Sequence, residues 1–357
     1  MGKKECGVYE SIINRALEIK HPLDVIWELT YRCNEKCEHC YVLQTDRNEL
    51  SKERCMKILQ ELADAGVLFI TFTGGEPFLR EDIFDLISEA RRLKFAVTIF
   101  TNGTLLGLEE CKWLSKKNLR SMEISLYGSK PETHDSITGV QGSFHSTIRA
   151  VECLIENGVR VVLKMIVMRK NVNELGELVR YAQECNVRFR WSSVLTPRND
   201  GDVSFMKDMR LSDNELRTIT EREFSLDEEP SPDLLLKAFD DLENKIPCSA
   251  GHTTCGILPD GTVLACPQFV QGTNNLKDSG FLEIWNESTH FKAIRNITES
   301  NLPECETCAA KFFCFRCQAH ALLEDGNLLG PSRESCREAF LKLELYESKT
   351  KIPATQD

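Results

Sequence analysis

A regular alternation of apolar runs and helical patterns constrains this chain more than any other feature. Six apolar, strand-like runs occur in succession, at 25–29, 67–73, 95–101, 119–126, 159–168 and 187–194. Helical patterns separate them, at 51–65, 81–93, 107–117, 143–157 and 173–185. Such repeats predict an α/β fold with a parallel sheet, because parallel strands need a long crossover between them. The pattern alone leaves open whether the sheet is doubly wound or curled into a barrel.

Serine and glycine mark the ends of two of these helices. Ser51 and Ser143 stand where the helices begin, and a serine side chain there accepts hydrogen bonds from free backbone amides. Gly66 and Gly158 follow the same helices, and glycine readily adopts the left-handed conformation that ends a helix. We therefore expect all four residues to act as helix caps.

A loop with three cysteines directly follows the first apolar run. Cys33, Cys37 and Cys40 lie within Thr30–Gln44 in a C-x3-C-x2-C spacing. Three thiolates on one short loop can bind three irons of an iron–sulfur cluster, whereas a cluster usually takes four thiolates. The fourth iron is then free to bind a substrate or cofactor. Zinc is the alternative, although a structural zinc site more often uses C-x2-C pairs and four ligands.

More cysteines gather in the last third of the chain. Cys255 and Cys266 flank two apolar runs around an Asp260-Gly261 turn, which is the sequence pattern of a β-hairpin. Eight thiols match two four-cysteine clusters, and two zinc sites are the alternative. The eight cysteines are Cys248, Cys255, Cys266, Cys305, Cys308, Cys314, Cys317 and Cys336.

Composition narrows the class of protein. A chain of 357 residues has room for a large domain and a smaller one. Its net charge of −11 argues against a nucleic-acid partner. No apolar run is long enough for a membrane span and the N-terminus has no apolar signal core, so we expect a cytoplasmic protein. In that reducing compartment, sixteen cysteines indicate metal ligation rather than disulfides.

The three-cysteine loop, with His39 just before its last cysteine, resembles the signature of the radical S-adenosylmethionine (radical SAM) enzymes. In that family the open iron of a [4Fe–4S] cluster binds S-adenosylmethionine (SAM), and one electron cleaves SAM to methionine and a 5′-deoxyadenosyl radical. The resemblance implies that Cys33, Cys37 and Cys40 are the catalytic cluster ligands. It also implies a partial (β/α)6 barrel, similar to a TIM barrel, with ligands at the C-terminal ends of the strands.

A GGEP sequence after the second strand resembles the family's motif for the SAM amino group. It consists of Gly74, Gly75, Glu76 and Pro77. Two glycines allow a backbone to approach a ligand closely, and a glutamate can accept hydrogen bonds from an ammonium group. We therefore expect these four residues, together with His39, to contact the cofactor.

Later strands carry further candidate cofactor contacts. By resemblance, Ser125 at the end of the fourth strand would meet the SAM carboxylate or ribose, and Asn102 after the third strand is another candidate. Lys164 in the fifth strand is a candidate if its side chain points into the barrel, with a solvent-facing lysine as the alternative. Residues 134–144 also resemble the family, but some relatives carry an arginine where Thr138 stands, which leaves the carboxylate partner open.

The C-terminal cysteines resemble the SPASM extension of peptide-modifying radical SAM enzymes, which holds two auxiliary [4Fe–4S] clusters. The shared pattern includes Gly261-x4-Cys266, a helix here at 281–295, a four-cysteine knot and a last cysteine. The gap between Cys314 and Cys317 is x2, where x3 is usual, which leaves the split of ligands open. By position, one cluster would take Cys248, Cys255, Cys266 and Cys317, and the other Cys305, Cys308, Cys314 and Cys336.

These patterns divide the chain into five parts. They are an arm (1–22), the radical SAM barrel (23–210), a helical bridge with helices at 212–224 and 233–244 (211–246), the SPASM domain (247–345) and a tail (346–357). Five cysteines stay outside the proposed clusters, one in the arm and four in predicted helices as small buried hydrophobes: Cys6, Cys55, Cys111, Cys153 and Cys185.

Three classes of function compete. The first is a maturase that makes a thioether or carbon–carbon cross-link in a ribosomally made peptide, or epimerises a residue. The second is a small-molecule enzyme, such as a haem-pathway decarboxylase or an alcohol dehydrogenase. The third, a non-catalytic electron-transfer protein, is disfavoured by the intact SAM motifs. Pro267 replaces an acidic residue of the sulfatase-maturing relatives, which disfavours formylglycine formation.

The expected partners follow from the same resemblance. Residues 1–24 leave no room for a fused leader-binding domain, so a peptide substrate would need a separate leader-binding protein or no leader. The three [4Fe–4S] clusters need an electron donor, for which we expect a ferredoxin or flavodoxin.

Overall fold

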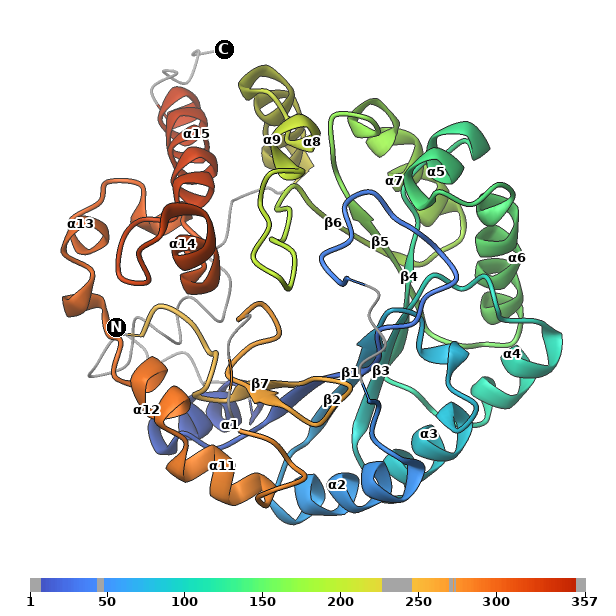
Figure 1. Cartoon of the computed structure of the whole chain (residues 1–357). Helices are drawn as coiled ribbons and strands as arrows, with labels where there is room; N and C mark the ends of the chain where they lie inside the picture. Colours follow the sequence, from blue (N-terminus) through green and yellow to red (C-terminus); the bar gives the residue numbers. More distant parts are fainter. Residues whose placement is uncertain (1–7, 44–47, 227–245, 270–271, 273, 351–357) are drawn as a thin grey trace.

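The structure is a computed structural model that describes residues 8–43, 48–226, 246–269, 272 and 274–350. Six strands form a parallel sheet whose spatial order follows the sequence, and helices surround its outer face in an arc (Figure 1). A doubly wound sheet would instead reverse its strand order at a switch point. The chain is therefore a partial barrel. Its strands are β1 Asp24–Thr30, β2 Phe69–Gly74, β3 Ala96–Thr101, β4 Ser121–Ser125, β5 Val161–Ile166 and β6 Arg188–Ser192.

Alternation along each strand separates an apolar outer face from a polar inner face. Val25, Trp27 and Leu29 of β1 are buried in the main core with side chains of the surrounding helices. Glu28, between them, faces the barrel interior. The helices that cover the outer face are α2 Lys52–Asp64, α3 Ile83–Arg92, α4 Leu108–Ser115, α6 Ser143–Glu156 and α7 Leu175–Glu184.

Three of the four predicted helix caps are confirmed. Ser51 accepts a hydrogen bond from the Arg54 amide (3.3 Å), and Gly66 and Gly158 have positive φ angles of 80° and 74°. The prediction for Ser143 is wrong. Helix α6 is preceded by Gly142 (φ 84°), and the Ser143 hydroxyl donates to Asp135 (2.9 Å), because the carboxylate already serves the start of this helix.

The predicted hairpin is present, and it joins the barrel. Strands β7 Thr254–Ile257 and β8 Val263–Leu264 are antiparallel, with Gly261 in the turn at φ 91°. Strand β7 also pairs in parallel with β1, so the cysteine-rich region continues the barrel sheet in the order β6-β5-β4-β3-β2-β1-β7-β8. The pattern of the sequence did not predict this junction.

The single helix expected at 281–295 is two helices. They are α11 Phe281–Glu287 and α12 Thr289–Arg295, and Ser288 between them accepts a hydrogen bond from the Phe291 amide. The indole of Trp285 donates to the Lys20 carbonyl (2.8 Å), which holds α11 against the segment that follows α1 Val8–Ile19. A serine can cap the second helix because its oxygen satisfies an amide that the first helix cannot reach.

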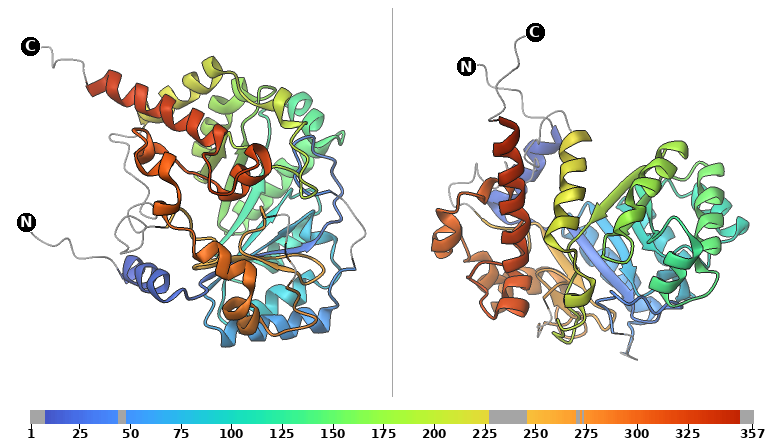
Figure 2. Two further views of the ribbon diagram at one scale, coloured as in Figure 1. Left: turned by 60° about the vertical axis from the view of Figure 1, so that its left-hand side comes forward. Right: turned by 90° about the horizontal axis from the view of Figure 1, so that it is seen from above.

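Helices α9 Asp213–Leu226 and α15 Arg333–Thr350 lie side by side (Figure 2). Ion pairs join them, between Arg337 and Asp213 (2.7 Å) and between Arg217 and Glu344 (2.6 Å). The helix predicted at 233–244 lies outside the described residues. None of the helices in the described ranges is long and apolar enough to cross a membrane. The remaining elements are α5 Pro131–Thr138, α8 Met206–Met209, α13 Pro303–Glu306, α14 Gln318–Asp325 and the 3-10 helices η1 Pro77–Leu79, η2 Val172–Glu174, η3 Glu299–Asn301 and η4 Lys311–Phe313.

The cysteines outside the proposed clusters mostly lie where the sequence placed them. Cys55 and Cys111 are fully buried in α2 and α4, and Cys153 is half-buried in α6. Cys185 is the residue that ends α7 rather than one inside it. Cys6 lies outside the described residues.

Candidate functional site

The three-cysteine loop leaves the C-terminal end of β1, at the mouth of the barrel (Figure 1). Burial is the main cause that raises the pKa of the Cys33 thiol to about 12, and Glu76, Glu35 and Cys40 contribute to that rise. Burial, Glu35 and the two neighbouring cysteines likewise raise the pKa of Cys37. These crowded thiols are neutral without a metal, so metal binding must release their protons. Three neighbouring thiols of this kind fit a cluster ligand set.

Gly74 and Gly75 bring the end of β2 against the cysteine loop. A Cβ atom at Gly74 would lie 2.2 Å from the Thr30 carbonyl oxygen, and one at Gly75 would lie 2.2 Å from the Arg32 carbonyl oxygen. The Gly75 amide donates to the Thr30 carbonyl (2.7 Å). In this structure the two glycines therefore make room for the loop backbone itself. Their contact with a cofactor stays a prediction.

Glu76 is fully buried and joins the GGEP segment to the end of β3. Its carboxylate accepts hydrogen bonds from the Phe78 amide (3.1 Å), the Thr101 hydroxyl (2.8 Å) and the Asn102 amide (2.9 Å). Burial raises its pKa to about 7, against these hydrogen bonds, which lower it. Pro77 opens η1 immediately afterwards. Glu76 thus has a structural role beside the predicted one toward the SAM amino group.

Asn102 connects β3 to the cysteine loop. The side-chain Nδ2 of Asn102 donates to the side-chain Oδ1 of Asn34 (2.9 Å). The side-chain Nδ2 of Asn34 in turn donates to the Thr104 hydroxyl (2.7 Å). Asn34 directly follows Cys33, so the end of β3 orients the first ligand of the loop.

The segment at 134–144 supports the same loop from the other side. The Lys36 amide donates to the Thr138 carbonyl (2.8 Å), and the Glu38 amide donates to the Ile137 carbonyl (3.0 Å). Thr138 is fully buried, and its hydroxyl lies 2.7 Å from that of Ser143. The Thr138 side chain is therefore used within the fold, and a SAM carboxylate needs another partner.

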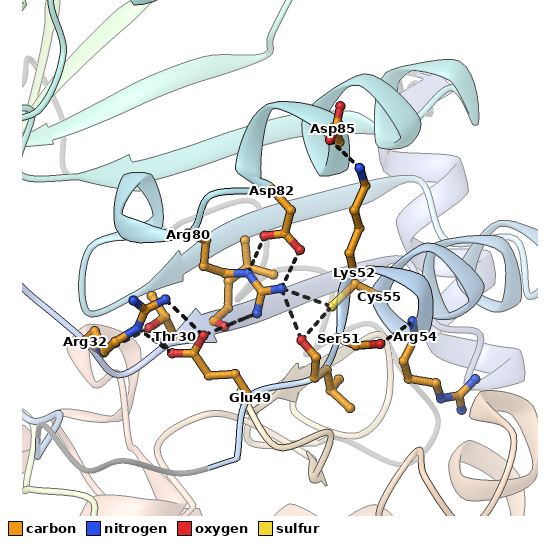
Figure 3. A network of polar contacts seen from close by, with 12 residues as sticks. Thr30, Arg32, Glu49, Ser51, Lys52, Arg54, Cys55, Arg80, Asp82 and Asp85 are labelled. Carbon is orange, nitrogen blue, oxygen red and sulfur yellow. Dashed lines mark hydrogen bonds and ion pairs between the residues drawn. The ribbon is translucent and has the colours of Figure 1, made fainter.

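A buried arginine holds the segment behind the loop (Figure 3). Arg80 donates to the Leu29 carbonyl (3.1 Å), the Leu50 carbonyl (3.1 Å) and Asp82 (2.7 Å). Its guanidinium also lies 3.6 Å from Glu49, which pairs with Arg32 of the loop (3.1 Å). This network fixes the end of β1, from which the cysteines start.

His39 and Ser125 meet at Tyr127. The His39 ring lies edge-on to the Tyr127 ring, with centroids 4.5 Å apart, and burial lowers the pKa of His39 to about 4. His39 is therefore neutral at physiological pH. Burial raises the pKa of Tyr127 well above its usual range, the nearby Cys37 adds to this rise, and the nearby Ser125 hydroxyl offsets part of it. Two predicted cofactor residues thus share one aromatic neighbour beside the cysteines.

Lys164 belongs to the barrel interior and not to the outer surface. Its ammonium nitrogen lies 3.4 Å from the Glu123 carboxylate and 3.5 Å from the centroid of the Phe100 ring. Arg190 on β6 lies 3.7 Å from the same carboxylate. Burial lowers the pKa of Lys164, and Glu123 offsets part of that effect. Contact between Lys164 and a cofactor stays a prediction.

The first auxiliary group is the set of Cys248, Cys255, Cys266 and Cys317. Burial is the main cause that raises the pKa of Cys266 to about 12, and the thiols of Cys248 and Cys317 contribute to that rise. Burial also raises the pKa of Cys255, to which Asp24 and Cys266 add. The Cys317 thiol donates to Gln268 (3.1 Å). Cys266 thus lies close enough to each of the three other thiols of the group to interact with it.

The second auxiliary group is the set of Cys305, Cys308, Cys314 and Cys336. All four line one cavity of about 660 Å³. Burial is the main cause that raises the pKa of Cys314 to about 12, and the three other thiols of the group contribute to that rise. Four thiols around one cavity fit an iron–sulfur cluster better than four separate structural cysteines.

Three polar residues at the site escaped sequence reasoning. Glu35 is buried between Cys37 and Glu76, with a pKa that burial raises to about 7. The Tyr41 hydroxyl donates to Glu28 (2.6 Å), deep in the barrel. A glutamate within an apolar strand run was a usable signal for Glu28, because such a charge is rarely buried without a partner.

Comparisons with known proteins agree with this geometry. Residues 27–182 match the family model of the Radical SAM superfamily, and residues 248–309 match SPASM, an iron-sulfur cluster-binding domain. Mycofactocin maturase MftC of Mycolicibacterium smegmatis is 30% identical over 317 residues, which cover 82% of this chain and 79% of that protein. AdoMet-dependent heme synthase of Methanosarcina barkeri is 25% identical over 330 residues, which cover 86% of this chain and 94% of that protein.

A solved structure shares the fold. The crystal structure of Streptococcus suis SuiB bound to its precursor peptide SuiA has a TM-score of 0.71 and 21% identity, and covers 94% of this chain and 82% of that one. The predicted fold class, a partial barrel with a cysteine-rich C-terminal region, is confirmed.

Proposed function

Because this chain belongs to the radical SAM superfamily and carries a SPASM iron–sulfur domain, we propose that it is a maturase of a ribosomally made peptide. Radical SAM domains bind SAM and a [4Fe–4S] cluster, and SPASM domains bind further iron–sulfur clusters. The modification is a thioether or carbon–carbon cross-link, or the epimerisation of a residue. The similarity to MftC carries the proposal, since it spans the barrel and the cysteine-rich region together.

The residues take the following roles in this proposal. Cys33, Cys37 and Cys40 hold the cluster, which supplies the electron for reductive cleavage of SAM to the 5′-deoxyadenosyl radical. Asn102, through Asn34, and the GGEP segment keep the loop in place. The two auxiliary groups hold one cluster each, which gives three in all.

The sheet offers a place for an extended peptide. Among the described strands, β6 pairs with β5 alone, so its other edge is free at the side of the barrel. An extended chain can add to such an edge through backbone hydrogen bonds. Arg190 and Ser192 on β6 face the same interior as Lys164, and they can contact the side chains of a bound peptide.

We also propose the partners that the chemistry needs. A ferredoxin or flavodoxin supplies electrons, and a separate protein binds the leader of the peptide if it has one. Cytoplasmic localisation fits the fifteen described cysteines, all of which are free thiols.

Co-expression with the short peptide encoded nearest to this gene tests the proposal. Mass spectrometry should show a peptide lighter by two hydrogens, or one of equal mass with deuterium from solvent if a residue is epimerised. The variant with alanine at positions 33, 37 and 40 is the control, and it should leave the peptide unchanged.

The similarity to the AdoMet-dependent heme synthase supports a second candidate function, the conversion of a porphyrin. A porphyrin converted with consumption of SAM, together with an unmodified peptide, would replace the maturase proposal. The porphyrin assay uses the reconstituted enzyme with a chemical reductant, and the triple alanine variant serves as its control as well.

A further inference from the structure

Arg316 lies at the junction of the two auxiliary groups. It occupies the shortened gap between Cys314 and Cys317, where the sequence reads CFRC. It lines the cavity shared by the second auxiliary group. In the chain it directly precedes Cys317, which belongs to the first auxiliary group. One side chain is thus tied to both sets of thiols.

Backbone carbonyls hold the Arg316 side chain in place. Its Nε donates to the Gly330 carbonyl (2.9 Å), and its Nη2 donates to the carbonyls of Gly330 (2.6 Å) and Leu328 (2.5 Å). Its Nη1 is buried and has no hydrogen-bond partner among the described residues. Within the part of the chain that the structure describes, no ion pair joins Arg316 to a carboxylate. Its positive charge is therefore not neutralised locally.

That charge reaches thiols of both groups. Burial raises the pKa of Cys305, and the Arg316 guanidinium offsets part of that rise. The same guanidinium lowers the pKa of Cys248 and Cys317 in the first group against the effect of burial. In the second group it acts in the same direction on Cys314 and Cys336. These directions agree with the geometry, in which Arg316 lines one cavity with the second group and directly precedes Cys317 of the first.

We propose that Arg316 is a redox-positioning residue that raises the reduction potentials of both auxiliary clusters. A cluster becomes more negative when it accepts an electron, and a nearby, partly buried cation stabilises that state. One cation between two clusters also weakens the repulsion between them when both are reduced. The inference rests on the ligand groups proposed above and is independent of the substrate.

A redox titration of the reconstituted, full-length enzyme, followed by electron paramagnetic resonance, tests this. In R316Q both auxiliary potentials should fall enough to shift each reduction equilibrium about tenfold, which corresponds to about 59 mV for one electron. R316K keeps the charge and should stay close to wild type. The potential of the cluster on the three-cysteine loop should not change in either variant.

R333Q is the matched control. The Arg333 side chain is 87% exposed and pairs with Asp325 at the surface, so its loss should leave both auxiliary potentials unchanged. Unchanged potentials in a fully iron-loaded R316Q would overturn the proposal. A shift of the auxiliary potentials in R316K as large as that in R316Q would also overturn the proposal. The hydrogen bonds of the guanidinium group, and not its charge, would then set the potentials.

R316H decides the case if R316Q binds less iron than wild type. A histidine with an ordinary pKa of about 6.5 loses its charge as the pH rises through that value. When the pH is raised from about 5.5 to about 7.5, the auxiliary reduction potentials of R316H should therefore decrease more than those of the wild type. An R316H variant with the pH dependence of wild type contradicts the inference. No substrate enters these titrations, so a failed peptide assay leaves their outcome intact.

Discussion

The two cysteine-bearing regions differ in what holds their thiols. The three-cysteine loop is fixed by buried side chains from several strand ends, among them Glu76, Asn102 and Arg80. The C-terminal thiols lie among very short elements, such as the two-residue strand β8, the four-residue helix α13 and the three-residue helix η4. These short elements contribute few backbone hydrogen bonds, whereas the apolar burial of the region comes from other segments, among them Phe281, Trp285 and Phe291.

This difference indicates two ways to build a cluster site. We expect the barrel to position its loop before the cluster binds, and the segment from Cys305 to Cys336 to depend on metal binding for a large part of its folding energy. Small metal domains commonly behave in the second way, because the ligands bring together segments that have little core of their own. The predictions below test this contrast.

The largest expected effect is on catalysis. Replacing Cys33, Cys37 and Cys40 by alanine should abolish formation of 5′-deoxyadenosine in the presence of dithionite, because no thiolate is left to hold the cluster. The barrel and the auxiliary clusters should remain, so iron should fall by about a third. Chromatographic assay of 5′-deoxyadenosine and iron analysis measure both. Undiminished cleavage of SAM in this variant would refute the assignment.

Iron removal should affect the two regions unequally. The loaded enzyme should contain about twelve irons if each of three sites holds a [4Fe–4S] cluster. After chelation, backbone amides between Cys305 and Cys336 should exchange with solvent more than about tenfold faster, because metal ligation contributes to the folding of these short elements. Amides of β1 to β5 should keep their protection. Hydrogen exchange with mass spectrometry follows both sets.

Two results would break this contrast. Equal loss of protection in both regions would show that the barrel also needs its cluster to fold. Four irons and two zincs per chain would show that the C-terminal sites are structural zinc sites.

The Arg80 network should stabilise the barrel with or without iron. Arg80→Met leaves Asp82 and two backbone carbonyls without their buried partner, which should cost about 3–5 kcal/mol. Urea unfolding of the iron-free protein, followed by tryptophan fluorescence, measures the loss. Arg92→Met is the control, since that side chain is 63% exposed, and it should change stability by less than about 0.5 kcal/mol. A similar loss in both variants would mean that the network does not hold the loop.

The smallest effect is expected at the seam between the two regions, where Asp24 lies opposite Thr254. Burial raises the pKa of Asp24 from 3.8 to about 6, and its buried Oδ1 has no hydrogen-bond partner among the described residues. The folded state therefore binds the proton more tightly than the unfolded state. The contribution of Asp24 to stability is greatest below about pH 4 and is lost as the pH rises through about 6.

Asp24→Asn should remove this pH dependence. At pH 8 it should stabilise the protein by about 1–2 kcal/mol, and at pH 5 by clearly less. Urea unfolding at both pH values measures the difference. Asp64→Asn, at an exposed position of α2, should give the same small change at both. If Asp24→Asn changes the free energy of unfolding equally at both pH values, water must reach the Asp24 carboxylate, and its pKa is not raised by burial.

Sequence reasoning found most of the barrel because its signals are local. The alternation of apolar residues predicts each strand within a few residues, as for 25–29 and the observed Asp24–Thr30. The C-x3-C-x2-C spacing likewise placed three thiols on one loop, since residues this close in sequence cannot separate far in space. The hairpin between Cys255 and Cys266 was also predictable, because Asp260-Gly261 is a local turn signal.

Tertiary structure alone decided which distant residues meet. Strand β7 joins β1, so Val25 lies opposite Cys255, although no periodicity links the two segments. Only glycine fits at positions 74 and 75, because the carbonyls of Thr30 and Arg32 occupy the space that a side chain would need. The hydroxyl of Thr138 forms a hydrogen bond with that of Ser143 inside the fold. The sequence specifies these contacts only through packing of the whole chain, because a buried polar group or a close backbone approach depends on its partner and not on its neighbours in sequence.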